Sequence, residues 1–200
     1  MIKKLRYALV VMLSACLLSA CSLMDPHPPS TLYDLGPLQL KAMGQLPADM
    51  PVIATRVHAP DWMEESLMIY RLDYVNNQQV RYYTQSSWAS SPTRLFKHRL
   101  DAYLMSIGNR AASTLETDSF NLQIIFEDFS QHFSDERTSM GRVAIRAILF
   151  KGQELIAQQR FLAEIPADTA DAAGGSQALS KGVDRIIANM MNWIVIKSAK

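Results

Sequence analysis

Residues 179–194 read LSKGVDRIIANMMNWI, and this stretch decides the fold. Its apolar side chains recur at helical steps, at Leu179, Val183, Ile186, Ile187, Met190, Met191 and Ile194. Such a stripe predicts a long amphipathic helix that must bury one face. Trp193 lies beside the stripe and is predicted to belong to the core. The helix therefore needs a partner surface, and the residues before it indicate a sheet.

Three strands are predicted upstream of this helix. In residues 120–126, apolar Phe120, Leu122, Ile124 and Phe126 alternate with other residues, which is the period of a strand with one buried face. Residues 143–149 repeat the pattern, and residues 155–165 form a third run. Short polar turns separate the runs, so we expect an antiparallel meander. Residues 166–175 are predicted to be the loop that leads into the last helix.

The first half of the chain predicts a second three-stranded unit and a helix. Residues 52–57, 67–74 and 79–84 are the three predicted strands, and the last two form a hairpin around Asn76-Asn77. Residues 31–35 are a short alternating segment that could add a further strand before them. Ser91-Pro92 opens a helix that closes at Gly108-Asn109, with charged Arg99 among its periodic apolar positions.

The resulting order is β-β-β, α, β-β-β, α. It predicts an α/β (α+β) fold with a three-stranded unit, a helix, a three-stranded antiparallel meander and a long C-terminal helix. Both helices are expected to pack on a mixed sheet.

The N-terminus has the features of a signal peptide. Lys3, Lys4 and Arg6 precede an uncharged run over residues 7–18, which is too short for a transmembrane helix of about 20 residues. Leu-Ser-Ala before Cys21 resembles the bacterial lipobox, in which the cysteine thiol takes the lipid. Cys16 follows the same tripeptide and is an alternative site, but it leaves a short apolar run. We therefore favour Cys21 over Cys16, and over an uncleaved apolar anchor.

This assignment divides the chain into three parts. Residues 1–20 are a cleaved signal peptide, residues 21–30 a lipidated flexible tether with three prolines, and residues 31–200 a single domain. Cys21 would carry diacylglycerol and an N-acyl chain, enough for stable anchoring. Ser22 stands where an aspartate tends to retain lipoproteins in the inner membrane. The expected location is therefore the periplasmic face of the outer membrane.

Composition excludes several kinds of site. Removal of residues 1–20 takes away three of 20 basic residues and none of 19 acidic ones, so the formal net charge changes from +1 to −2. Nucleic-acid binding favours a basic face and is not expected. Both cysteines lie at or before position 21, so the domain holds no internal disulfide, zinc-thiolate site or cysteine nucleophile.

No pattern in the sequence indicates catalysis. The four histidines, His27, His58, His98 and His132, are isolated from one another, and His98 is expected on a solvated basic face with Lys97 and Arg99. The acidic pairs at 64–65, 127–128 and 135–136 are interpreted as solvated turns and strand ends. We therefore expect no catalytic residue, no metal site and no cofactor beyond the lipid on Cys21, and an undetected hydrolase is the alternative.

Two tryptophans are candidates for partner binding. Trp62 lies in a predicted polar loop, and Trp88 lies just before the first helix. Exposed aromatic side chains on loops often form interfaces. The alternative, which we favour, is that each indole packs at the edge of the core.

Several motifs occur together in an order that resembles the ABC-type transport auxiliary lipoprotein family. They are the lipobox, TLYDL at 31–35, VHAP at 57–60, RYYTQSSW at 81–88 before a helix with Leu95, LQIIFEDF at 122–129, and DAAGGSQAL at 171–179 with Trp193 near the end of that helix. The resemblance covers nearly the whole mature chain.

The resemblance implies a non-enzymatic role in an MCE-type lipid transport system, such as that of the paraquat-inducible operon. The lipoprotein would dock the periplasm-spanning MCE protein of an ABC permease at the outer membrane, and ring-like homo-oligomers would suit such a partner. It also implies a fold like the N-terminal domain of the Tol-system propeller protein. Two alternatives stay open: an assembly or scaffold lipoprotein of a secretion apparatus or lipopolysaccharide translocon, and direct lipid carriage in an apolar pocket.

Overall fold

The computed structural model describes residues 30–40, 52–109 and 119–198. The predicted signal peptide, Cys16, Cys21 and nearly all of the predicted tether lie outside these residues. The described elements are β1 Thr31–Tyr33, β2 Ile53–His58, the 3-10 turn η2 Asp61–Met63, β3 Leu67–Leu72, α2 Asp73–Asn76, β4 Asn77–Trp88, α3 Pro92–Ser106, β5 Phe120–Phe133, β6 Ser139–Lys151, β7 Glu154–Pro166 and α4 Ala172–Ser198. The predicted mixed α+β fold is confirmed.

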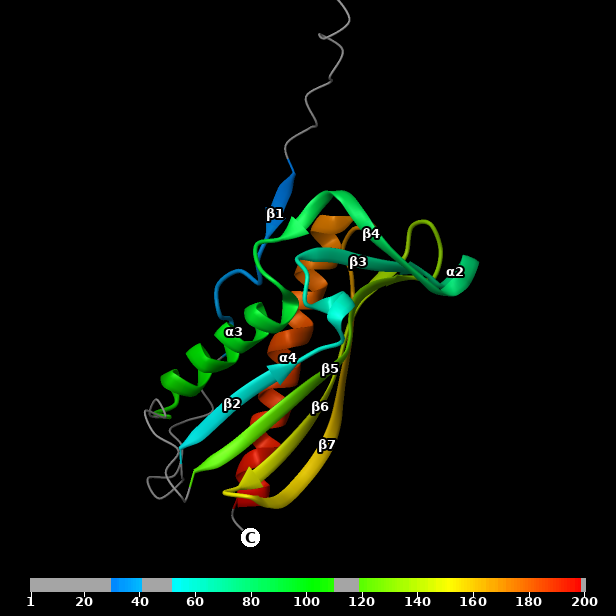
Figure 1. Ribbon diagram of the computed structural model, residues 1–200. Coiled ribbons are helices and arrows are strands. Elements are labelled where there is room, and N and C mark those ends of the chain that lie inside the picture. The colour runs from blue at the N-terminus through cyan, green and yellow to red at the C-terminus, as the bar shows by residue number, and fades with distance from the viewer. Residues whose placement is uncertain (1–29, 41–51, 110–118, 199–200) are drawn as a thin grey trace, which may run out of the picture.

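All seven strands belong to one mixed sheet (Figure 1). Its order is β1-β4-β3-β5-β6-β7, and β2 also pairs with β5. The meander β5-β6-β7 is antiparallel, as predicted. β2 runs parallel to the first half of β5, while β3 runs parallel to its last residues. The long strand β5 therefore joins the two halves of the chain.

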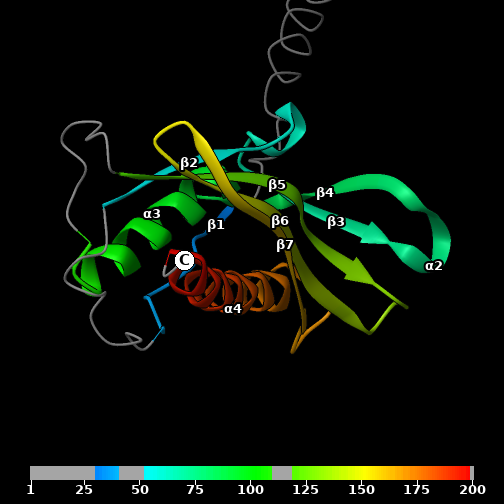
Figure 2. The same cartoon turned by 90° about the horizontal axis from the view of Figure 1, so that it is seen from below.

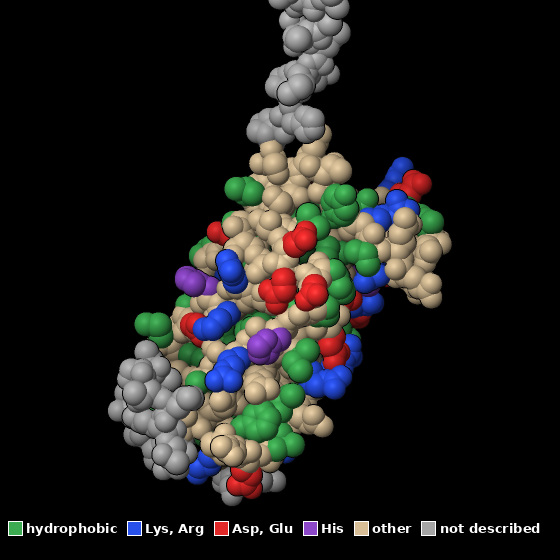
Figure 3. Space-filling view, viewed as in Figure 1, with side chains coloured by type: hydrophobic (Ala, Val, Ile, Leu, Met, Phe, Trp, Pro, Cys, Tyr) green, Lys and Arg blue, Asp and Glu red, His purple; other side chains and the backbone are tan. Residues whose placement is uncertain are grey.

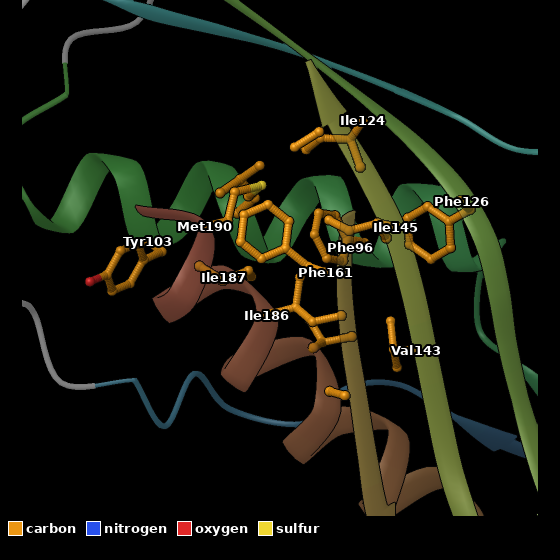
Figure 4. Close-up of a cluster of buried hydrophobic side chains, with 14 of the residues drawn as sticks. Phe96, Tyr103, Ile124, Phe126, Val143, Ile145, Phe161, Ile186, Ile187 and Met190 are labelled. Carbon is orange, nitrogen blue, oxygen red and sulfur yellow. The ribbon is translucent and has the colours of Figure 1, made fainter. Parts of the chain in front are cut away.

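The two longer helices, α3 and α4, lie on the same side of the sheet (Figure 2). The stripe of α4 predicted from the sequence is buried there, with Val183, Ile187, Met190 and Ile194 all at 0% exposure. Phe96 of α3 is also fully buried. Figure 4 shows these helices packed on the inward-facing side chains of β5, β6 and β7. Trp193 is buried as predicted, and its ring meets Phe161 edge-on at 5.8 Å.

The strand β5 is longer than its apolar alternation predicts. It continues through residues 127–133, where the polar residues Ser130, Gln131 and His132 are buried and hydrogen-bonded. The interpretation of Glu127-Asp128 as a strand end was wrong. The pair lies in the middle of β5, at a bulge that shifts the register between Phe126 and Asp128.

The helix α4 also begins earlier than predicted, since residues 172–175 are helical rather than a loop. The Asp171 carboxylate accepts a 2.8 Å hydrogen bond from the Gly174 amide. This bond, more than any other contact, lowers the pKa of Asp171, as expected for an acid at a helix start. A Cβ on Gly175 would lie 2.0 Å from the Gln131 side chain. A Cβ on Gly174 would lie 2.1 Å from the backbone carbonyl oxygen of Thr169, so close packing rather than a loop accounts for the two glycines.

Another glycine lets α4 approach the sheet closely. A Cβ built on Gly141 of β6 would lie 2.7 Å from the backbone nitrogen of Leu179. On α4, a Cβ on Gly182 would lie 3.1 Å from a methyl group of Val143, which is the end of a side chain. The backbone of Leu179 cannot move aside for a Cβ at position 141, whereas the Val143 methyl group can move aside for one at position 182.

We expect Gly141→Ala to lower the free energy of unfolding by about 1–3 kcal/mol, because the helix must move away from β6. Gly182→Ala is the matched control. It should be neutral or stabilising by up to about 1 kcal/mol, since alanine favours the helix. Urea denaturation of both variants checks this, and equal destabilisation by the two would contradict it.

Candidate functional site

The side of the β5-β6-β7 meander opposite α3 and α4 is covered by no α-helix among the described residues (Figure 2). Ile125, Arg146 and Arg160 face one another across its three strands, and Leu162 of β7 follows two residues after Arg160 on the same side. Together with Glu127 at the bulge, these five residues form what we call the outer sheet face. Ile125 and Leu162 are exposed there at 38% and 47%.

Two cations share one anion on the outer sheet face. Glu127 Oε1 accepts from Arg146 Nη2 at 2.9 Å, and Oε2 accepts from Arg160 Nε at 2.5 Å. The hydrogen bond from Arg160 is the main reason that the pKa of Glu127 is lowered. Both arginine side chains remain more than half exposed, at 54% and 56%. The cluster carries an excess positive charge and suits an acidic partner segment.

The surroundings of the outer sheet face carry charges of both signs. Arg142 and Glu164 neutralise each other through a 2.8 Å pair on the same side of β6 and β7. Exposed Arg56 of β2 lies opposite Gln123 of β5. The face seen in Figure 3 carries side chains of both signs, with a group of acidic ones in its middle. The local excess of arginine is thus confined to the cluster around Glu127.

A second candidate surface lies on the β3–β4 hairpin, which projects from the body of the domain (Figure 1). We call the exposed side chains of Trp62, Tyr74, Val75, Val80 and Tyr82 the hairpin patch. Val80 and Tyr82 are 45% and 57% exposed and, being two residues apart in β4, point to the same side. The predicted hairpin is present, but its turn is a single helical turn, α2, instead of a tight turn at Asn76-Asn77.

The two candidate tryptophans occupy different environments. Trp62 lies in η2 and is 41% exposed, with the Arg71 guanidinium 6.0 Å from its ring. Its role in partner binding stays a prediction. Trp88 is the last residue of β4 and is only 2% exposed, with its ring 5.5 Å from Phe129. The proposal of Trp88 as a partner contact was wrong, because its indole fills the core.

The buried His132 forms a polar network that sequence spacing did not indicate. Its Nδ1 lies 2.9 Å from Asp73, and its Nε2 lies 3.1 Å from both Ser130 Oγ and Asp128. A serine, a histidine and an aspartate in line resemble a hydrolase triad. However, Ser130 is 0% exposed and donates its hydroxyl proton to Asp128, so no substrate reaches it. The network instead fastens the turn after β3 to β5.

The other buried ionic group is Arg99, which was expected on a solvated face. It is 6% exposed and binds Asp184 of α4 through two hydrogen bonds of 2.6 and 3.0 Å. Its guanidinium also donates to the carbonyls of Gly36 and Pro37. Ser180 Oγ accepts a further Arg99 bond and donates to the Leu35 carbonyl. We call this network the Arg99 clamp. It joins α3, α4 and the chain that follows β1, while neighbouring His98 is exposed as predicted.

Hollows in the described part of the molecule are open and lie at the surface. One of about 350 Å³ lies between residues 32–39 and α4, and another of about 310 Å³ lies between β2 and α3. The space between sheet and helices is filled by side chains (Figure 4). Neither of these two hollows is the enclosed apolar cavity that lipid carriage would need. The described residues contain no cluster of His, Cys, Asp and Glu that could hold a metal, and none of their helices is long and apolar enough to cross a membrane.

Solved structures of other proteins share this fold. XCC0632 from Xanthomonas campestris, of the family DUF330, has a TM-score of 0.70 and 15% identity, covering 84% of this chain and 97% of its own. An uncharacterized protein has a TM-score of 0.65 and 19% identity, and the match covers 83% of this chain and 99% of that protein. CT253, a hypothetical protein from Chlamydia trachomatis, has a TM-score of 0.50 and 10% identity, and the match covers 74% of this chain and 98% of CT253. At these identities the likeness shows the fold alone. No family model and no curated protein matches the sequence.

We expect the Arg99 clamp to be needed for stability rather than for binding. Arg99→Met leaves Asp184 partly buried without its partner and should lower the free energy of unfolding by about 3–5 kcal/mol. The double variant Arg99→Met/Asp184→Leu should recover at least half of this loss, because no uncompensated charge remains. Thermal denaturation of the single and double variants measures both effects, and a double variant as unstable as the single one would contradict this account.

Proposed function

We propose that this chain is a non-enzymatic lipoprotein of the outer membrane, anchored through Cys21, that docks the MCE protein of an ABC-type transport system. The lipobox and the ordered motifs over residues 31–179 support this family role. The proposal covers the partner, the outer-membrane location and the absence of catalysis.

The observation that carries the proposal is the uncovered and positively charged outer sheet face. It offers half-exposed Arg146 and Arg160 beside the apolar Ile125 and Leu162. Arginine next to apolar side chains is typical of protein-binding surfaces. The buried polar networks, by contrast, are engaged within the fold. We therefore assign the MCE contact to this face, with an acidic segment of the partner opposite the arginines.

The anchor adds to this contact by confinement. Residues 21–30, fully extended, span at most about 35 Å, so the domain stays close to the membrane surface. A partner that reaches this surface meets a high effective concentration of the domain. A modest affinity at the outer sheet face is then sufficient for docking.

The anchor can be tested directly. We expect mass spectrometry of the mature chain from membranes to show an N-terminal Cys21 bearing diacylglycerol and an N-acyl chain. Cys21→Ser should abolish both cleavage and lipidation, because the acceptor thiol is lost. Cys16→Ser is the matched control and should leave the mature mass unchanged. Lipid on Cys16 in the native chain would overturn the assignment.

The partner contact is tested by co-purification of the lipidated chain with the MCE protein of its own system. Arg146→Ala/Arg160→Ala should reduce recovery of the MCE protein about tenfold, because the positive charge is lost. Arg146→Lys/Arg160→Lys should retain most of it. Arg185→Ala removes an exposed arginine from α4 and should have no effect.

Folding is not expected to explain the loss, since exposed ion pairs contribute about 0–1 kcal/mol each. Thermal unfolding of the alanine pair should therefore stay close to that of the native protein. Equal recovery of the MCE protein with all variants would remove the outer sheet face from the proposal. Recovery of secretion or lipopolysaccharide-translocon components, with no MCE protein, would favour an assembly lipoprotein instead.

A further inference from the structure

We propose that the β3–β4 hairpin lies on the phospholipid surface, and that the hairpin patch forms a second, non-covalent membrane contact beside the lipid anchor. The inference goes beyond the MCE contact and rests only on the lipid anchor of the proposed function. Three features of the hairpin support it: its composition, its place relative to the tether, and its firm attachment to the sheet.

The hairpin patch has the composition of a membrane-interface surface. It contains five of the eleven exposed large hydrophobic residues among the described part of the chain, and three of these five are aromatic. Tryptophan and tyrosine favour the headgroup level, because each has an apolar ring and a polar atom. Polar amides fill the turn between them, at residues 76–79. Such a surface fits phospholipid headgroups over shallow acyl chains.

The charges near the hairpin patch are of both signs. Exposed Asp61, Glu64 and Glu65 flank Trp62, while Arg71 lies on the same side of the hairpin as Tyr82. Asp73, the acidic residue of the hairpin, contacts His132. Arg71 lies over the Trp62 ring and donates to the Asn77 carbonyl, which places its guanidinium at the patch. Anionic headgroups attract basic residues at this position. Arg71 and the aromatic side chains of the patch thus face the same surface.

The sheet places the tether and the hairpin at one end of the domain. β1 is parallel to the end of β4, with Thr31 opposite Ser86. Thr31 thus lies beside the C-terminal end of β4, in the same half of the domain as the β3–β4 hairpin (Figure 1). From Ser86 to Asn77 the strand covers about 30 Å, and the tether spans at most about 35 Å. A domain tilted toward the membrane brings the hairpin patch onto it.

The hairpin is held firmly enough to present a defined surface. Asp73 at its turn contacts buried His132, and Tyr83 donates a 2.9 Å hydrogen bond to Gln131. Burial raises the pKa of the Tyr83 hydroxyl, which stays protonated and keeps donating. Tyr70 packs between Tyr83 and Phe133, with ring distances of 4.8 and 5.8 Å. A preformed surface loses less conformational entropy on binding than a free loop.

The absence of cysteine from residues 22–200 makes the test specific. Val80→Cys is labelled with an environment-sensitive fluorophore in the native lipoprotein, on vesicles of phosphatidylethanolamine and phosphatidylglycerol. Leu155→Cys is the matched control, since Leu155 is 54% exposed and lies next to the β6–β7 turn at the other end of the domain. Tyr82→Cys provides a second site in the hairpin patch.

We expect lipids brominated in their acyl chains to quench the fluorophore at positions 80 and 82 about threefold more than at position 155, as for a side chain at the interface. Equal quenching at the three positions overturns the proposal. A second result would also overturn the proposal. If the fluorescence change at position 80 grows with protein density at constant lipid but does not respond to bromination, the hairpin contacts a second copy of the chain and not the lipid.

The outcome is separable from the proposed function. Mass spectrometry of the labelled sample first establishes the lipid on Cys21, so an unlipidated chain counts against the anchor and not against the hairpin. The vesicles contain no MCE protein, so the Arg146 and Arg160 variants test docking independently. Circular dichroism of each labelled variant establishes that the domain is folded.

Discussion

The architecture depends on the burial of the apolar stripe of α4 against β5, β6 and β7. The helix has 27 residues and is about 40 Å long, close to the length of the 13-residue strand β6. One helix can therefore cover the meander along its whole length, and α3 covers the part of the sheet around β2. Because both helices lie on one side, the other side is left for binding. Close approach at Gly141 sets how near α4 lies to β6.

Regular periodicity made much of the fold predictable. The stripe of α4, the first half of β5, the strands β6 and β7 and the hairpin all repeat apolar residues at the steps of their own secondary structure. The sequence was less informative where polar residues are buried, as in residues 127–133 and at Arg99. Asp184, the partner of Arg99, lies 85 positions away, so no local pattern reports the contact. The sequence Gly174-Gly175 is typical of a loop. Only the structure shows that Thr169 and Gln131 pack against these two glycines at the start of α4.

The candidate site was predictable only in part, for the same physical reason. Trp62 and Trp88 looked alike as aromatic residues near loops, and only the pairing of β4 with its neighbours shows that Trp88 is buried. The arginines of the outer sheet face belong to neighbouring strands, so their proximity needs the register of the sheet. Arginine side chains have two different roles in this fold. Arg99 is buried among protein acceptors, whereas Arg146 and Arg160 share Glu127 and remain open to solvent.

The placement of β1 has a mechanical consequence. A pull on a lipid attached at Cys21 would reach the domain at Thr31, along the axis of β1. Its backbone bonds to β4 would then be loaded in shear and share the force, instead of opening one after another. Three residue pairs alone resist little force. The Arg99 clamp, however, binds the carbonyl oxygens of Gly36 and Pro37 in the chain that follows β1. The force is then transmitted through the Arg99 clamp to α3 and α4. The domain can therefore bear tension between the membrane and its bound partner.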